Sequence, residues 1–590
     1  MTEQTGWLRR HRNLLAALLL MLAAWCLYLP SVRYGFVYYD DVRILLNHPE
    51  LYGQANLFAD MREIFVTSFP REEPLLLRDV SWALDSKLFG FGNALGYHLG
   101  NVLLNGMVVA LMFAFLMGTT RRYGFALAVS IAWLVLAVHT EPVDWIMGRK
   151  DILSTLFMLL ALCAQTRRLA VGNVRASCGW YAVTVICFLC GLLSKISVLT
   201  FPLVLLLHAI FLPYLNGERP PNGVFPWNRA LVKEVFLFVP AFVASILVYR
   251  WYGGILAQMG VLDRGYTAHG FAHLWNLLMI NPLAIWVYVQ QTFLPWHLQV
   301  LYTWPDISAS YPGWQIAASL GLVVAAGGIG AWMFCVRKDL FFYYAAFFVI
   351  MLPYLNLIYS GIILAERYLY FSAFCLLALA VSVAIPILQR PKTLLRSGVL
   401  ASGIGFVALN LFQTLSYQPA WRNGETLWQY HLTLPQTTPT AYANLAAYYY
   451  ADATAHQGTP EMSLAMTKMS VVVDAGLKQF WPDRRQPPPP DTYFLFFLQS
   501  IVQEVNGQPE SALASLLTSD QLHPKFDSTN LNLARLYRKL SMATANPNQK
   551  MEYARIAQAR FAEYISLAFR DRPPPPEVQK EFEDIKAAAK

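Results

Sequence analysis

"NLLAALLLMLAAWCLYLP" (residues 13–30) is an apolar run without a charged side chain, and it sets the fold class of the chain. Arg9, Arg10 and Arg12 precede it, and positively charged residues favour the cytoplasmic side of a membrane. "YLPSVRYGF" follows, in place of the small residues of a signal-peptide cleavage site. The run therefore predicts a retained first membrane helix with its N-terminus in the cytoplasm. The next segment, "GFVYYDDVRILLNHPELYG" (35–53), then emerges on the outer side.

The composition separates the chain into two parts. Hydrophobic residues make up 56% of the 590 residues and charged residues only 14%, whereas soluble proteins carry about 25% charged residues. Charged residues, Asn, Gln and Pro return in the last part of the chain. We therefore predict an all-α protein, with a polytopic membrane domain over 1–415 and a helical soluble domain over 416–590. The expected environment is a lipid bilayer, no nucleic-acid partner is expected, and the seven cysteines, all in or beside apolar runs, indicate no disulfide framework.

Apolar runs recur through the membrane domain, and we expect about eleven of them to cross the bilayer. One further run, 277–295, contains Asn281 and Gln290. Irregular, polar backbone at membrane depth needs protein or a wet cavity around it, so this run is expected to be half-inserted or interfacial. Counting crossings from the N-terminus places the loop 31–98 and the C-terminal domain outside. The predicted spans lie at about 14–30, 99–118, 124–140, 152–166, 178–193, 198–214, 235–251, 315–335, 340–359, 368–389 and 395–415.

The C-terminal domain has the pattern of a helical repeat. Residues 491–524 read as a helix, a glycine turn, a second helix and a proline stop, over the 34-residue period of a tetratricopeptide unit. A looser helical hairpin is predicted on each side, and three units are about the minimum for a stack that buries its own core. We expect this domain to present an acceptor or a partner protein.

Asp40 and Asp41 lie where the first span leaves the membrane. A carboxylate at this position can act as a general base toward a hydroxyl group or can coordinate a metal ion. The alternative is an N-cap for a helix that begins near Val42, for which one aspartate would suffice.

Four cations on the expected outer side are candidates for binding a phosphate group. Arg149 and Lys150 stand in one short loop, where the alternative is that they anchor a helix end at the interface. Lys195 lies between two apolar halves, and ionisable residues at that depth are functional candidates. Arg367 follows Glu366 at another span edge, and an internal ion pair between these two is the alternative.

Further candidates surround these residues in the expected outer loops. Glu141, Glu366, Arg78 and Tyr302 are assigned supporting roles toward a sugar or an acceptor, and so is His98, although a lone histidine is more often structural. Trp296, Tyr302 and Trp304 can stack on sugar faces. Together the residues predict one pocket for a lipid-linked sugar phosphate, with the tail in the bilayer, the phosphate on Arg and Lys, and the sugar carbon facing a base.

Several segments, taken in order, resemble GT-C-class glycosyltransferases that carry C-terminal tetratricopeptide repeats. The resemblance points to bacterial relatives of the transmembrane-and-TPR protein O-mannosyltransferases. It covers most of residues 30–375. The segments are "YDD…NHPELYG", "PLLLRDVSWALDSKLFGFGNALGYHLGNVLLN", "HTEPVDWIMGRKDILSTLFMLLAL", "GLLSKISVLTFPLVLLLHAIF", "LPWHLQVLYTWP" and "AERYLYFSAF".

The resemblance implies a GT-C membrane domain in a bacterial inner membrane, with its active site facing the periplasm. It implies inverting transfer of a monosaccharide from a polyprenyl phosphate to Ser or Thr of exported proteins. Asp40 and Asp41 would supply the base. No cofactor is required, and a divalent metal at the aspartate pair is optional. The cations that the resemblance assigns to the donor phosphate are Arg149, Lys150, Lys195 and Arg367.

The sequence departs from the family before the second predicted span. "EPLLLRDVSW" stands where the family usually has "HPLTWLS", so charged Arg78 and Asp79 occupy positions that are less charged elsewhere. This leaves open transfer to a lipid or glycan acceptor. A transporter or a scaffold that recruits partners through the repeats is a third possibility, although transporters commonly show duplicated halves and the spans show no internal duplication.

Overall fold

The computed structural model describes residues 2–67, 75–218, 229–258, 271–302, 311–355, 362, 364–391, 393–569 and 573–588. Within these ranges all regular secondary structure is helical, as the composition predicts. The chain divides into two compact units, Met1–Asn423 and Gly424–Lys590. Residues 416–423 pack with the first unit, because Gln418 donates to the carbonyl of Leu27 and the carbonyl of Arg422 accepts from Gly35.

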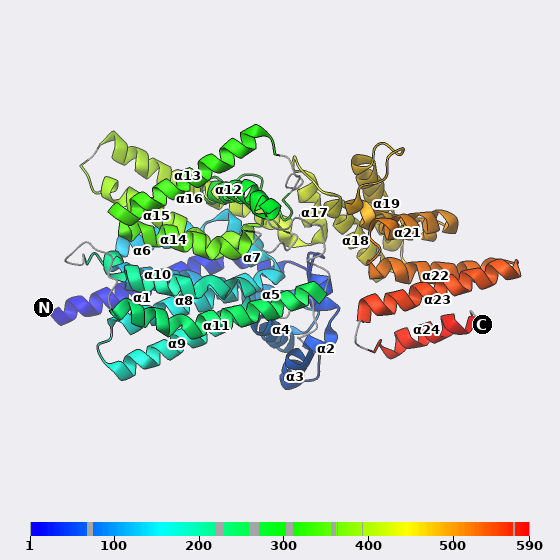
Figure 1. The fold of residues 1–590 in the computed structure, drawn as a ribbon, viewed down its shortest axis with the longest axis horizontal. Coiled ribbons are helices and arrows are strands. Elements are labelled where there is room, and N and C mark those ends of the chain that lie inside the picture. Colours follow the sequence, from blue (N-terminus) through cyan, green and yellow to red (C-terminus); the bar gives the residue numbers. More distant parts are fainter. Residues whose placement is uncertain are drawn as a thin grey trace. The chain divides into compact units, whose positions relative to one another are not determined.

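Long helices that lie side by side form the first unit (Figure 1). The first helix packs on the helix that begins at Ala94, and the helices on either side of residues 171–173 form a hairpin. The long helices are α1 (Thr2–Tyr28), α5 (Ala94–Thr120), α6 (Tyr123–Leu134), α8 (Arg149–Ala170), α9 (Val174–Ser194), α10 (Phe201–Leu215), α11 (Arg229–Gln258), α12 (Phe271–Phe293), α13 (Gly313–Val336), α14 (Lys338–Met351), α15 (Leu369–Leu388) and α16 (Leu394–Tyr417).

Eight helices among the described residues are long and apolar enough to cross a membrane, or nine if the bent pair Tyr123–Leu134 and Ala137–Asp144 counts as one span. Large apolar side chains such as Val324 on α13 and Ile404 on α16 are exposed, which fits contact with lipid. The predicted spans 152–166 and 340–359 are not among the eight or nine. The first belongs to α8, which carries charged residues at both ends; the second belongs to α14, whose 14 residues fall short of the roughly 20 that cross a bilayer.

The first unit also contains further helices and single helical turns between the long helices. They connect the ends of the long helices, and several are single turns with 3₁₀ geometry. They are η1 (Leu29–Arg33), η2 (Val42–Leu46), α2 (Pro49–Tyr52), α3 (Leu57–Thr67), α4 (Leu76–Phe89), η3 (Ala137–His139), α7 (Thr140–Asp144), η4 (Ile146–Gly148), η5 (Ile196–Thr200), η6 (Leu352–Tyr354), η7 (Glu366–Tyr368) and η8 (Gln418–Arg422).

The second unit is a series of antiparallel helix pairs, and none of its described helices meets the length and hydropathy expected of a membrane span. The predicted helix–turn–helix over 491–524 forms, with Gly507 in the turn at φ 70°, a conformation that glycine adopts at little cost. Buried Ala512 lets the two helices approach. That these pairs are tetratricopeptide repeats stays a prediction. The helices are α17 (Gly424–Leu432), α18 (Pro439–Ala455), α19 (Pro460–Phe480), α20 (Tyr493–Val505), α21 (Pro509–Leu522), α22 (Asp527–Ala543), α23 (Pro547–Phe569) and α24 (Pro576–Ala588).

Candidate functional site

The loop after α1 holds a buried carboxylate, that of Asp41. Its Oδ2 accepts the backbone N–H of Val37 at 2.8 Å, and its Oδ1 accepts the indole N–H of Trp145 at 2.9 Å. Burial raises the pKa of Asp41 to about 7; the charge of Asp40 adds to this effect and the two hydrogen bonds oppose it. A carboxyl group whose pKa lies near neutral pH is suited to general-base catalysis.

Helix capping does not account for the Asp41 side chain. The residue stands at the N-cap of η2, yet its side chain makes no capping hydrogen bond. Asp40 differs, because 26% of its side chain is exposed and its Oδ1 lies 3.4 Å from the guanidinium of Arg43. Of the two adjacent aspartates, Asp41 is therefore the buried one and the candidate base.

Trp145 connects Asp41 to one of the predicted cations. The indole ring stacks on Tyr39, with 5.4 Å between ring centroids, and the guanidinium carbon of Arg367 lies 5.5 Å from an indole centroid. The carboxylate of Asp41 and the guanidinium of Arg367 thus contact the same side chain, although they are far apart in the sequence.

The buried partner of Arg367 is Glu141, not Glu366. The Glu141 carboxylate forms an ion pair with the guanidinium, and its second oxygen accepts the backbone N–H of Arg367 at 2.8 Å. Glu366 instead accepts the N–H of Gln299 at 2.5 Å and the hydroxyl of Tyr302 at 2.9 Å. The alternative of a Glu366–Arg367 ion pair is therefore wrong, because the two adjacent side chains have different partners.

Lys195 contacts two tyrosines, one of which also contacts Arg367. Its ammonium forms an ion pair with Asp151 and lies 4.9 Å from the ring centroid of Tyr354 and 5.5 Å from that of Tyr368. The two rings stack, with 4.1 Å between centroids. The Arg367 guanidinium carbon lies 5.3 Å from the Tyr368 ring, so both cations contact one tyrosine.

A small cavity of about 20 Å³ is lined by Arg367 and by Asp151, the partner of Lys195. One carboxylate oxygen of Asp151, Oδ2, has no hydrogen-bond partner among the described residues. The lining combines charged groups, hydroxyls and apolar side chains, as expected of a site for an amphiphilic ligand. It includes Asp151, Ser154, Thr155, Met158, Ser197, Thr200, Phe201, Ile350, Tyr354, Arg367, Tyr368, Tyr370 and Phe371.

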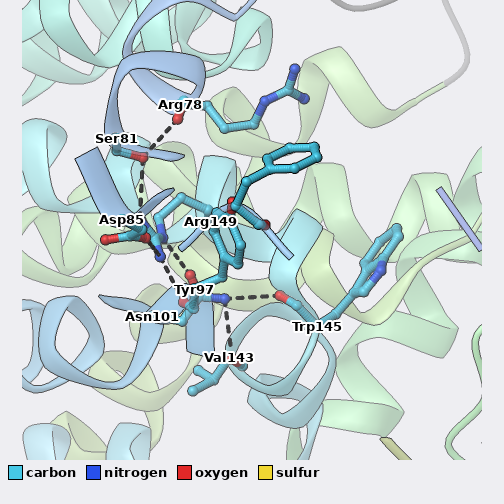
Figure 2. Close-up of polar contacts among 9 residues, drawn as sticks. Arg78, Ser81, Asp85, Tyr97, Asn101, Val143, Trp145 and Arg149 are labelled. Atoms are coloured by element: carbon cyan, nitrogen blue, oxygen red, sulfur yellow. Dashed lines mark hydrogen bonds and ion pairs between the residues drawn. The ribbon is translucent and has the colours of Figure 1, made fainter. Parts of the chain in front are cut away.

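Arg149 belongs to a separate network, which Figure 2 shows. Its guanidinium donates to the side chains of Asn101 at 2.5 Å, Ser81 at 3.2 Å and Asp85 at 2.7 Å, and to the carbonyl of Tyr97 at 2.6 Å. Because Ser81 and Asp85 belong to α4 and Tyr97 and Asn101 belong to α5, these contacts hold α8 against both helices. Binding of a donor phosphate by Arg149, which stays a prediction, requires exchange of some of these partners.

The Arg149 network nevertheless supports the candidate base. Asn101, which accepts from Arg149, donates through its Nδ2 to the carbonyl of Trp145 at 2.9 Å and to that of Val143 at 3.3 Å (Figure 2). The backbone of Trp145 is thereby held while its indole N–H reaches Asp41.

The other predicted residues occupy different places. Arg78 forms an ion pair with Asp79 at 2.9 Å, and its guanidinium carbon lies 4.6 Å from the ring of Trp82. The Nε2 of His98 lies 3.3 Å from the carbonyl oxygen of Gly35. Lys150 is buried. Of the aromatic residues predicted to stack on a sugar, Tyr302 contacts Glu366, Trp296 is exposed, and Trp304 lies outside the described residues.

The structure adds Asp151, Trp145, Tyr354 and Tyr368 to the site. Asp151 stands directly after Arg149 and Lys150 in the sequence, and an acidic residue beside this predicted cationic pair was the available signal. Tyr354 and Trp145 carry no comparable signal, since tyrosine and tryptophan are frequent throughout this chain. Within the described ranges, no group of three or more His, Cys, Asp or Glu residues is arranged to hold a metal ion.

The fold and the site define a class, namely a multi-span helical membrane protein with a buried acidic and cationic centre. No family model matches the chain, and no solved structure matches it. Among curated proteins, it is 30% identical to mouse Protein O-mannosyl-transferase TMTC1 over 35% of this chain and 23% of the relative. It is 31% identical to Drosophila melanogaster Protein O-mannosyl-transferase Tmtc1 over 42% of this chain and 29% of the relative. It is 23% identical to human Protein O-mannosyl-transferase TMTC4 over 70% of this chain and 61% of the relative.

The chain is thus a distant homologue of the TMTC protein O-mannosyltransferases. The matches span less than two thirds of the length of these relatives.

Proposed function

We propose that this chain transfers a monosaccharide from a polyprenyl-phosphate donor to Ser or Thr hydroxyls of exported proteins, with inversion at the anomeric carbon. The observation that carries the proposal is the meeting of Asp41, Arg367 and Lys195 through Trp145 and Tyr368. A base, two cations and a cavity with hydroxyl and apolar lining suit a sugar phosphate attached to a lipid.

Asp41 acts as the base in this proposal. Each of its carboxylate oxygens already accepts one hydrogen bond, and each oxygen has a second lone pair. It takes the proton of the acceptor hydroxyl while the hydroxyl oxygen attacks the anomeric carbon. The bond between that carbon and the phosphate oxygen breaks, and the polyprenyl phosphate leaves with the electron pair.

Lys195 and Arg367 stabilise the departing phosphate, whose negative charge grows in the transition state. In the structure each cation is paired with a buried carboxylate, Asp151 or Glu141. The Tyr354–Tyr368 stack places the ammonium beside the cavity. The helical second unit presents the acceptor protein, and we propose that the site faces the periplasm of a bacterial inner membrane.

The test is transfer in membranes from cells that express Asp41→Asn or Asp40→Asn. We expect Asp41→Asn to lower the rate by about 10²- to 10⁴-fold, the usual effect of losing a positioned base, and Asp40→Asn to have a smaller effect. Mass spectrometry of exported proteins from a deletion strain identifies the acceptor, since Ser or Thr peptides lose a hexose mass. Full activity of both variants would exclude the assignment, and unchanged protein glycans with altered lipid or glycan sugars would redirect it to another acceptor.

A further inference from the structure

A second, smaller cavity is lined by Glu366, the residue before Arg367, and contains an acceptor that has no partner among the described residues. Its volume is about 10 Å³, and its polar lining is Tyr288, Gln291, Tyr302 and Glu366. Glu366 is only 2% exposed. Its Oε1 accepts from Tyr302 and from the backbone of Gln299, whereas its Oε2 has no hydrogen-bond partner among the described residues.

The other polar side chains of this cavity already have hydrogen-bond partners. The side-chain amide of Gln291 accepts the backbone N–H of Trp296 at 3.1 Å and donates to the carbonyl of Trp296 at 3.0 Å. The hydroxyl oxygen of Tyr288 accepts the N–H of Ala365 at 3.3 Å. In its ionised form the Glu366 carboxylate only accepts hydrogen bonds, so a ligand that binds this form must supply a donor. A hydroxyl group meets this requirement, whereas a phosphate dianion does not.

We propose that Glu366 accepts a hydrogen bond from a hydroxyl of the transferred sugar and so helps to determine which sugar is used. The inference rests on the proposed function, because it needs a sugar phosphate at Arg367. The two residues are neighbours in η7: Arg367 lines the larger cavity and Glu366 the smaller one. In this proposal, the sugar attached to a phosphate on Arg367 extends toward Glu366 across the same helical turn.

Glu366→Gln tests the inference with little change in shape. The amide oxygen keeps the contacts with Gln299 and Tyr302, because both of these residues donate. The amide nitrogen then takes the place of Oε2, and it cannot accept a hydrogen bond from a ligand. Donors are a short polyprenyl-phosphate mannose, chosen because the relatives are named for mannose transfer, and its 2-, 3-, 4- and 6-deoxy analogues. We expect the wild type to disfavour one analogue by about 10- to 100-fold, the range for one hydrogen bond to a charged group.

In Glu366→Gln, we expect the discrimination against that one analogue to disappear, with the ratios for the other analogues unchanged. Tyr302→Phe removes one donor that orients the carboxylate and is expected to lose part of the same discrimination. Asp60→Asn is the matched control, because Asp60 is a buried acid paired with Lys87 at 2.7 Å in a different part of the unit. Its thermal stability is expected to fall without a change in the analogue ratios.

Equal loss of rate with all donors in Glu366→Gln would overturn the inference, and so would an effect confined to the KM of the acceptor peptide, which would place the acceptor hydroxyl at Glu366. If Glu366→Gln fails to fold, the rate ratios of Tyr302→Phe for the deoxy analogues decide whether the inference holds. A wild type that transfers sugar but discriminates against no analogue refutes the inference alone. A wild type that transfers no sugar refutes the proposed function and the inference with it.

Discussion

Two networks of buried charge in the first unit use similar side chains to different effect. In the network around Arg149, the guanidinium donates four hydrogen bonds, to Asn101, Ser81, Asp85 and Tyr97. In the network around Lys195 and Arg367, the cations are also paired, but Asp151 and Glu366 each retain an oxygen that has no partner in the part of the chain the structure describes, and both residues line cavities.

This difference separates a scaffold from a site. A buried polar atom without a partner costs about 1–3 kcal/mol, so a fold does not retain several around cavities without a compensating role, such as ligand binding. A network whose polar groups all have hydrogen-bond partners has no free donor or acceptor for a ligand, and its role is to hold helices together. The following predictions test that distinction, beginning with the largest expected effect.

Arg149→Met should destabilise the first unit most. It leaves Asp85 buried without its cation, and breaking a buried pair costs about 3–5 kcal/mol. We expect a large fall in the unfolding temperature of the detergent-solubilised protein, which Asp85→Asn in the same chain partly restores. Arg167→Met is the control, because Arg167 lies exposed on the same helix. Unchanged stability of Arg149→Met would contradict the scaffold role.

Lys195→Met should separate stability from activity. Removal of the ammonium leaves Asp151 unpaired, and the double variant Lys195→Met with Asp151→Asn should recover most of the lost thermal stability. It should not recover transfer, which we expect to stay about 10²- to 10³-fold below wild type, as for loss of one group that stabilises transition-state charge. If the double variant recovers both thermal stability and transfer, the network around Lys195 only stabilises the fold and is not part of the site.

The pH dependence of transfer should follow Asp41. The base must be ionised to act, and its pKa is about 7, so the rate should fall about tenfold for each pH unit well below 7. The sign for stability is opposite. Because the folded-state pKa is raised from 3.8, the folded state binds the proton more tightly between about pH 4 and 7, and stability falls as pH rises through this window. Asp41→Asn should remove both dependences, as measured by initial rates and thermal unfolding.

The sequence named several residues that the structure brings near one another, but not their pairing. The apolar runs predict an all-helical membrane fold, and the described helices agree. The partners depend on long-range packing: Arg367 pairs with Glu141 from α7 instead of its neighbour Glu366. The number of spans was also predicted too high, because α8 carries charged residues at both ends and α14 has only 14 residues.

The smallest effect is expected from Trp145→Phe, which keeps an aromatic ring beside Tyr39 and Arg367 but removes the N–H that reaches Asp41. That hydrogen bond favours the ionised carboxylate, and its loss, worth about 1–2 kcal/mol, should move the pH–rate profile upward by roughly one pH unit. Trp421→Phe is the matched control, since Trp421 is fully buried and its indole N–H has no hydrogen-bond partner within the described ranges. If both variants keep the wild-type profile, Trp145 acts only as packing and Asp41 is not the group that sets the profile. If only Trp145→Phe shifts it, the indole that contacts Arg367 also sets the proton affinity of the base, which ties the two halves of the site together through one side chain.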